Sequence, residues 1–354
     1  PVTIAHLVCR LLLEKKNDSD CSPAKLANGG IRSLERAGVD SIFFPMMIKT
    51  PSEMGRWDNV NMCAVVAGYP NVARLNSTQT SVRIDTPAFH WTTRSMRNKQ
   101  LAGFLKDRWG VGRPQARRAI QAGDAALASF RRKLRSAGDD VLVNLESTDG
   151  FGVLLAARPY QNDQIIGGKV ADEFIKLGVP VLLPESLPPV ATSELLKLRV
   201  DTVNPFQVRM YSAAIYAARH PNLEVVQLVS FGCGHDPIVG DELNRVVSAV
   251  SDKAVLQIKV DEGDAEAPLS LRVRSFVETV RARRMRRATA PKPSPRSLPR
   301  PFPIRFQRKH KKDRVIFTPN ISQAHCDVIA AITARSGYRS QPMPVADRRA
   351  VELG

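Results

Sequence analysis

Three of the five cysteines stand where a thiolate could serve as a ligand or a redox group. Cys233 lies between two glycines in "SFGCGHD", directly after the apolar run "LEVVQLV". These glycines let the backbone turn sharply and approach a ligand closely. Cys21 precedes Pro23, which favours the start of a helix, so the dipole of that helix would favour a thiolate at Cys21. Cys63, in "NMCAVVAGYP", lies just before a short apolar segment.

The spacing of these three cysteines does not by itself define a metal site. They are 42 and 170 positions apart, whereas zinc and iron–sulfur sites that are recognised by spacing contain local pairs such as C-x-x-C. From the residues alone, a shared cluster and three unrelated thiols both remain open. Cys9, in "HLVCRLLL", and Cys326, flanked by helical apolar residues, are predicted to be small core residues.

Four polar residues near these loops are candidates to bind a ligand or to support a cluster. Arg158 and Tyr160, in "ARPYQND", could contact an anionic ligand such as a CoA phosphate, although an arginine at a strand end also serves as a structural ion-pair partner. His235 and Asp236 follow Cys233, and they are candidates to support a cluster or to cap the loop.

A further acidic loop offers a less specific signal. Asp261, Glu262 and Asp264 could act as acid–base groups or bind a hard cation, or they could be turn and cap residues before the next helix. His90 and Trp91 receive no role from the sequence.

Short apolar strands alternate with helix-length segments after residue 150. The expected strands are 151–157, 179–183, 223–230 and 254–260, and the expected helices are 163–178, 206–219, 237–250 and 269–284. This pattern is typical of βαβ units, so residues 146–283 are predicted to form an α/β domain whose parallel sheet is covered on both faces. Ligands bind beyond the carboxyl ends of the strands in such sheets. The loops that carry Arg158 and Cys233 fall at that edge.

Residues 1–145 are predicted to form a separate α/β domain that bears cysteines. A helix over 23–38 ends at Gly38, and a strand over 39–45 is stopped by Pro45. A longer helix is expected over 115–138, and we expect it to pack through an apolar stripe at helical spacing: Ile120, Leu127, Phe130 and Leu134.

The formal charge of +18 is concentrated in one segment. Residues 281–314 contain fourteen Lys and Arg against one acid, so the other 320 residues carry a net charge of only +5. Six prolines in this segment favour extended backbone, and residues 284–313 are therefore predicted to be a basic linker. Residues 314–354 begin with a strand and a helix, and we expect them to be the start of a further, truncated α/β module.

Several classes of protein are disfavoured by what the sequence lacks. No run of about eighteen apolar residues predicts a membrane span, and the first residues do not resemble a signal peptide. Five scattered cysteines do not fit a secreted disulfide framework, so a reduced, cytoplasmic setting is expected. No G-x-S-x-G elbow points to a hydrolase, and no Walker motif or G-x-G-x-x-G predicts ATP binding by this chain.

Five sequence blocks carry a resemblance to a known family. In chain order they are "CSPAKLANGGIRSLERAGVDSIFFPMM", "NMCAVVAGYP", "IDTPAFHW", "ARPYQND" and the long block that begins "SFGCGHDPIVGDELNRVVSAV". Together they resemble iron–sulfur proteins related to the 2-hydroxyacyl-CoA dehydratases and their activators, and the resemblance covers about Cys21 to Arg284. Several blocks in the same order are more specific than any single motif.

The resemblance implies a Rossmann-like iron–sulfur protein in which Cys21, Cys63 and Cys233 together hold a 4Fe–4S cluster. Because such clusters normally take four Cys ligands, three protein thiolates would leave one iron open. The resemblance further implies electron transfer or reductive activation on acyl-CoA-type substrates, as a component of a dehydratase-type (lyase) or reductase system with an ATP-dependent activator as partner. The alternative is a binding module that contacts nucleic acid or an acidic protein through residues 281–314, although the body of the chain lacks the basic surface that nucleic-acid binding predicts.

Overall fold

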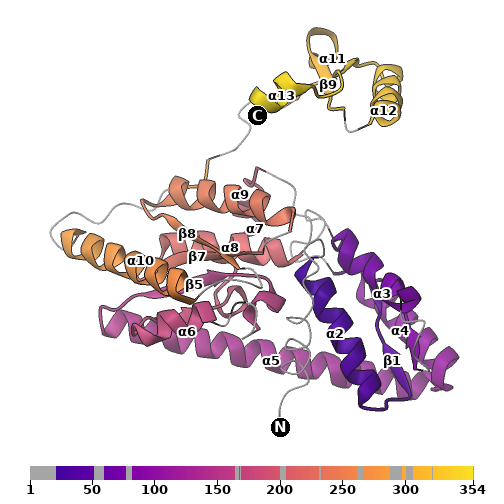
Figure 1. The fold of residues 1–354 in the computed structure, drawn as a ribbon, viewed down its shortest axis with the longest axis horizontal. Coiled ribbons are helices and arrows are strands. Elements are labelled where there is room, and N and C mark those ends of the chain that lie inside the picture. The colour runs from indigo at the N-terminus through magenta and orange to yellow at the C-terminus, as the bar shows by residue number, and fades with distance from the viewer. Residues whose placement is uncertain are drawn as a thin grey trace. The chain divides into compact units, whose positions relative to one another are not determined.

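The chain divides into two compact units, residues 1–300 and residues 301–354 (Figure 1). The computed structural model describes residues 21–51, 60–76, 82–163, 167, 169–199, 205–230, 233–260, 266–287, 297–299, 306–320 and 322–353. Cys9 and the acids Asp261, Glu262 and Asp264 lie outside these residues. Among the helices that are described, none combines the length and the apolar character needed to cross a bilayer.

A four-stranded parallel sheet lies at the centre of the first unit, in the order β6–β5–β7–β8. The strands are β5 (Gly152–Ala156), β6 (Val181–Leu182), β7 (Leu223–Ser230) and β8 (Val255–Val260). The predicted bounds of β7 are confirmed, and the other three strands are shorter than predicted. The predicted parallel α/β fold is confirmed.

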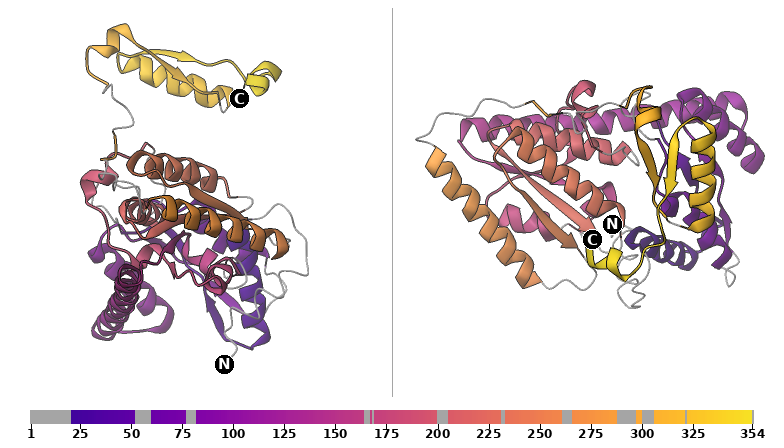
Figure 2. Two further views of the ribbon diagram at one scale, coloured as in Figure 1. Left: turned by 90° about the vertical axis from the view of Figure 1, so that its left-hand side faces the viewer. Right: turned by 90° about the horizontal axis from the view of Figure 1, so that it is seen from above.

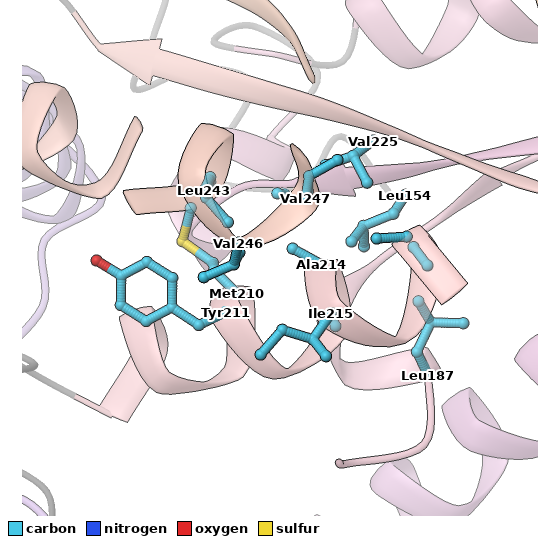
Figure 3. Close-up of a cluster of buried hydrophobic side chains, with 14 of the residues drawn as sticks. Leu154, Leu187, Met210, Tyr211, Ala214, Ile215, Val225, Leu243, Val246 and Val247 are labelled. Carbon is cyan, nitrogen blue, oxygen red and sulfur yellow. The ribbon is translucent and has the colours of Figure 1, made fainter. Parts of the chain in front are cut away.

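Helices cover both faces of this sheet, as predicted (Figure 2). One face packs against α8 (Pro205–Arg219) and α9 (His235–Val250), and the other packs against α6 (Lys169–Lys176) and α10 (Glu266–Arg287). Successive strand residues point to opposite faces. Leu154 and Val225 therefore belong to the core beneath α8 and α9 (Figure 3), whereas Val153 and Val226 belong to the core beneath α6 and α10.

The segment before the sheet forms two short strand pairs with helices around them. Its elements are α2 (Ser22–Arg36), β1 (Ser41–Phe43), β2 (Met46–Lys49), α3 (Ala64–Asn76), β3 (Arg83–Asp85), β4 (Ala88–His90) and α4 (Arg94–Trp109). β1 pairs with β3 and β2 pairs with β4, both in parallel. Among its described residues, the buried apolar residues that form a common core are Ile31, Ile42, Ala73 and Ile84.

The helix α5 (Arg113–Ser147) is longer than predicted and crosses the predicted domain boundary at residue 145. It runs beside both α4 and the sheet region (Figure 1). The prediction that its apolar stripe packs is wrong for Leu127 and Phe130, which are 48% and 61% exposed. Its contacts with the sheet core come later in the helix, through Leu142 and Leu145, and neither Leu127 nor Phe130 belongs to a core cluster of the described residues.

The start of the predicted linker is part of the folded unit. The helix α10 continues to Arg287, and two of its arginines make ion pairs with the body of the unit: Arg283 with the buried Glu224, and Arg284 with Asp149 at 3.1 Å. Leu298, in the middle of the predicted linker, is buried in the core beneath α8 and α9. Part of the basic charge of residues 281–314 therefore serves the fold.

The second unit pairs β9 (Val315–Thr318) in parallel with β10 (Arg339–Pro342), and α12 (Gln323–Arg335) connects them. Two short helices, α11 (His310–Asp313) and α13 (Arg348–Leu353), flank this pair along the chain. The prediction that Cys326 is a core residue is confirmed, because it is 1% exposed and its thiol donates a hydrogen bond to the carbonyl oxygen of Thr318 at 3.2 Å.

A buried carboxylate in the N-terminal segment leads to a prediction about pH. Asp85 is 7% exposed and accepts hydrogen bonds from Arg83 at 2.8 Å and Arg108 at 2.6 Å. Burial would raise the pKa of Asp85, but these hydrogen bonds outweigh burial and lower the pKa below its ordinary value. The unfolded chain therefore binds this proton first as the pH falls, and the stability that Asp85 contributes is lost in the acidic range.

We expect the variant Asp85→Asn to be less stable than the parent at neutral pH and to lose less stability between neutral and acidic pH. Urea unfolding at a series of pH values measures both effects. Equal pH dependence in the two proteins would contradict the role given to this carboxylate.

Candidate functional site

The strand order places the candidate site at a crevice that parallel sheets commonly use. After β5 the chain adds β6 on one side, and after β6 it returns to add β7 and β8 on the other side. The direction in which strands are added therefore reverses between β5 and β7, and ligands bind at the carboxyl ends of strands at such a switch point. The loop after β5 carries Arg158 and Tyr160, and the loop after β7 carries Cys233.

Each of the three candidate thiols lies at the start of a helix. Cys21 is the residue that caps α2, Cys63 directly precedes α3, and Cys233 lies two residues before α9. The backbone N–H of Val66 donates a hydrogen bond to the Cys63 sulfur at 3.4 Å. Free N–H groups and the positive end of the helix dipole both favour negative charge on a nearby sulfur.

Cys21 lies close enough to Cys63 and Cys233 for the charge of either one to act on its thiol. Burial raises the pKa of the Cys21 thiol, and negative charge on Cys233 and Cys63 raises it further. A hydrogen bond from the Ala24 N–H and the positive charge of Arg158 act in the opposite direction. All three cysteines are free and partly exposed. The fold thus brings together side chains that are 42 and 170 positions apart.

Arg158 connects the loop after β5 to the cysteine loop. Its guanidinium donates to the Asp236 carboxylate at 2.7 Å, and it lies close enough to the Cys233 side chain for the two to interact electrostatically. The guanidinium carbon lies 4.9 Å from the centre of the Tyr160 ring, which is a cation–π distance. The side chains of Arg158 and Asp236 are only 12% and 2% exposed, so this is a buried ion pair. Arg158 is therefore held in place by neighbouring side chains.

Two further residues complete this network and were not identified from the sequence. Gln161, which is fully buried, donates to the Ser230 hydroxyl at 2.8 Å and accepts a hydrogen bond from the Arg158 N–H at 2.8 Å. Ser230 in turn lies 3.0 Å from the Tyr160 hydroxyl, and its N–H donates to Asp236 at 2.7 Å. Burial raises the pKa of Tyr160, so its phenol keeps its proton at neutral pH.

The remaining candidates have simpler surroundings. His235 is partly buried in the first turn of α9, beside the fully paired Asp236. His90 ends β4, and the neighbouring Trp91 ring stacks on Phe89 with 5.0 Å between ring centres. Neither His90 nor Trp91 belongs to the network of Arg158.

Fold and site together define a parallel α/β protein with three thiols at or near helix starts, close to its topological switch point. The chain belongs to the family described as the CoA enzyme activase uncharacterised domain (DUF2229), which matches residues 8–187, about half of the chain. No curated protein and no solved structure matches the chain. The family match includes Cys21, Cys63 and Arg158 and ends before Cys233.

Proposed function

We propose that this protein is an iron–sulfur component of a CoA-enzyme activation system, in which Cys21, Cys63 and Cys233 jointly hold a 4Fe–4S cluster. The observation that carries the proposal is the meeting of three free thiols from three helix starts beside a sheet switch point. Membership of the activase-related family supports the same class of function.

Among the described residues, the three thiols are not arranged around one point as the ligands of a single ion would be. In the described part of the chain, no group of three or more His, Cys, Asp and Glu side chains is arranged to hold a metal ion. Ligands of one ion must all reach the same point, at about 2.3 Å for a zinc–thiolate bond. Thiolates around a 4Fe–4S cluster bind different irons and need not converge in this way. Thiolate is also the ligand that such clusters take.

The residues around the thiols have separate tasks in this proposal. The starts of α2, α3 and α9 present N–H groups that offset negative charge on the sulfurs. Arg158 places positive charge beside Cys233, and Asp236 holds the Arg158 guanidinium in place. Gln161 and Ser230 hold the Asp236 and Tyr160 side chains in place. When bound, a 4Fe–4S cluster supplies one-electron transfer and, at an iron without a protein ligand, Lewis acidity.

The proposed role is electron transfer or reductive activation for an enzyme that acts on acyl-CoA-type substrates. The description of the family, a CoA enzyme activase domain, favours this substrate class. Activation of this kind needs an energy source, and we assign that part to an ATP-dependent activator domain or protein, which the activase-related family description favours.

The test is anaerobic reconstitution of the purified protein with iron and sulfide. We expect a broad visible absorbance, together with iron and sulfide in equal amounts, and we expect single variants Cys21→Ala, Cys63→Ala and Cys233→Ala to lose most of both. Cys326→Ala is the matched control, because it removes a thiol from the second compact unit. Circular dichroism of each variant establishes that it is folded. If folded variants kept the absorbance of the parent, the three thiols would not be the ligands.

A further inference from the structure

A wide groove lies between α4 and α5, in a part of the protein that the proposed thiol site does not use. Its volume is about 880 Å³. The charged residues that line it include Lys99, Lys106 and Asp107 from α4 and Arg113, Arg117 and Asp124 from α5. Pockets for small ligands commonly measure about 300–1,000 Å³, so a molecule of nucleotide size fits the groove.

The groove carries an excess of positive charge. Of its two carboxylates, Asp124 is paired with Arg97 at 2.7 Å and with Arg94 at 3.7 Å. The other cations of the groove are Lys99, Lys106, Arg113 and Arg117, and none of them has a carboxylate partner among the described residues. Asp107 is the one further acid that lines the groove.

The local backbone adds to this positive potential. The helix α5 begins at Arg113, one of the lining residues, and its first turn contains no acidic residue. The N-terminal N–H groups and the dipole of a helix favour anions, phosphate above all. The groove also contains small or apolar positions, Ala102, Gly103 and Ile120, against which a flat ring can lie.

The groove differs from Arg158, the residue that the sequence analysis predicted as a candidate to bind an anion. Arg158 is buried and committed to Asp236, Cys233 and Tyr160. The unpaired cations near α4 and α5 are exposed and share one groove. Lys and Arg side chains in such an arrangement bind phosphate groups through charge-assisted hydrogen bonds.

We propose that the α4–α5 groove binds a small ligand that carries adjacent phosphates linked to a ring system, that is, a molecule with a nucleotide diphosphate group. Free coenzyme A and ATP both contain this group, and inorganic pyrophosphate contains its charged part alone. The site is independent of the thiols, so its failure would leave the proposed cluster untouched.

The experiment is isothermal titration of the full chain at low salt with coenzyme A, ATP and inorganic pyrophosphate in separate runs. We expect saturable binding of at least one nucleotide, weaker binding of pyrophosphate, and a loss of affinity as salt is added. The double variant Lys106→Glu/Arg113→Glu should weaken nucleotide binding by about tenfold or more, which corresponds to about 1.4 kcal/mol. A preference for coenzyme A or for ATP identifies the source of the phosphates.

The matched control is Arg131→Glu/Arg132→Glu. These residues are exposed on the same helix α5, and at 1.5 Å per residue they lie about 20 Å beyond Arg117 along the helix axis. The control makes the same change in net charge, and we expect it to bind as tightly as the parent. The proposal is overturned if none of the three probes binds the parent, or if the groove and control variants lose affinity equally, which would indicate general attraction to a basic protein.

Discussion

Asp236→Ala should destabilise the protein by about 3–5 kcal/mol, because it leaves the buried Arg158 guanidinium without its carboxylate partner. The same change removes the acceptor for the Ser230 N–H, so it also breaks the link between the end of β7 and the start of α9. Urea or guanidinium unfolding of the apo protein measures the loss directly. We further expect weaker retention of iron after reconstitution, since Cys233 lies in the loop that this link holds.

Asp241→Ala is the control for this prediction. Asp241 belongs to the same helix α9 and pairs with Arg199, but it is 69% exposed, and surface ion pairs contribute only about 0–1 kcal/mol. A double variant that also replaces Arg158 by Met should recover part of the loss, because the unpaired buried charge is gone. If Asp236→Ala and Asp241→Ala lowered the free energy of unfolding equally, the buried ion pair would not be the cause of the loss.

Gly138→Ala should also destabilise the protein, although alanine is the better helix former. Gly138 lies in α5 where this helix passes the short 3-10 helix η3 (Pro184–Ser186), and an added Cβ would lie 2.2 Å from the backbone oxygen of Ser186. Backbone atoms cannot rotate away as a side chain does, so α5 would have to shift. Overpacking of this kind costs about 1–3 kcal/mol.

Gly123→Ala provides the opposite case on the same helix. Apart from its chain neighbours and the backbone of α5 itself, no atom of the described residues lies within 4 Å of its added Cβ, so helix propensity dominates, and we expect a gain of up to about 1 kcal/mol. Thermal and urea unfolding of the two variants measure the difference in sign. Stabilisation by both substitutions would show that α5 is not packed against η3 in solution.

The sheet could be predicted from the sequence because its strands are buried on both faces. Such strands are apolar throughout, and the run "LEVVQLVS" gives β7 its bounds. The loops at the carboxyl ends followed from this pattern. The sequence alone therefore assigns Arg158 and Cys233 to one edge of the sheet.

Long-range polar contacts could not be predicted in the same way. The side chains of Gln161 and Ser230 form a hydrogen bond although they are 69 positions apart in the sequence. The residues next to each of them contain no pattern that predicts this partner. The prediction that the apolar stripe on α5 packs against a core failed for a related reason. Periodicity identifies the face of a helix that is apolar, but whether Leu127 and Phe130 meet a core depends on where the other elements end.

The three thiols come from two different regions of the fold, so any group that binds all of them also cross-links these regions. Cys21 and Cys63 lie at helix starts of the N-terminal segment, whose described core cluster is small, whereas Cys233 belongs to the larger sheet region. A ligand shared by these positions acts as a cross-link that closes two long chain loops and restricts the unfolded chain, as a disulfide does. Release of this ligand would remove the cross-link between the N-terminal segment and the sheet region. The chemical state of the thiols would therefore also affect the stability of the N-terminal segment.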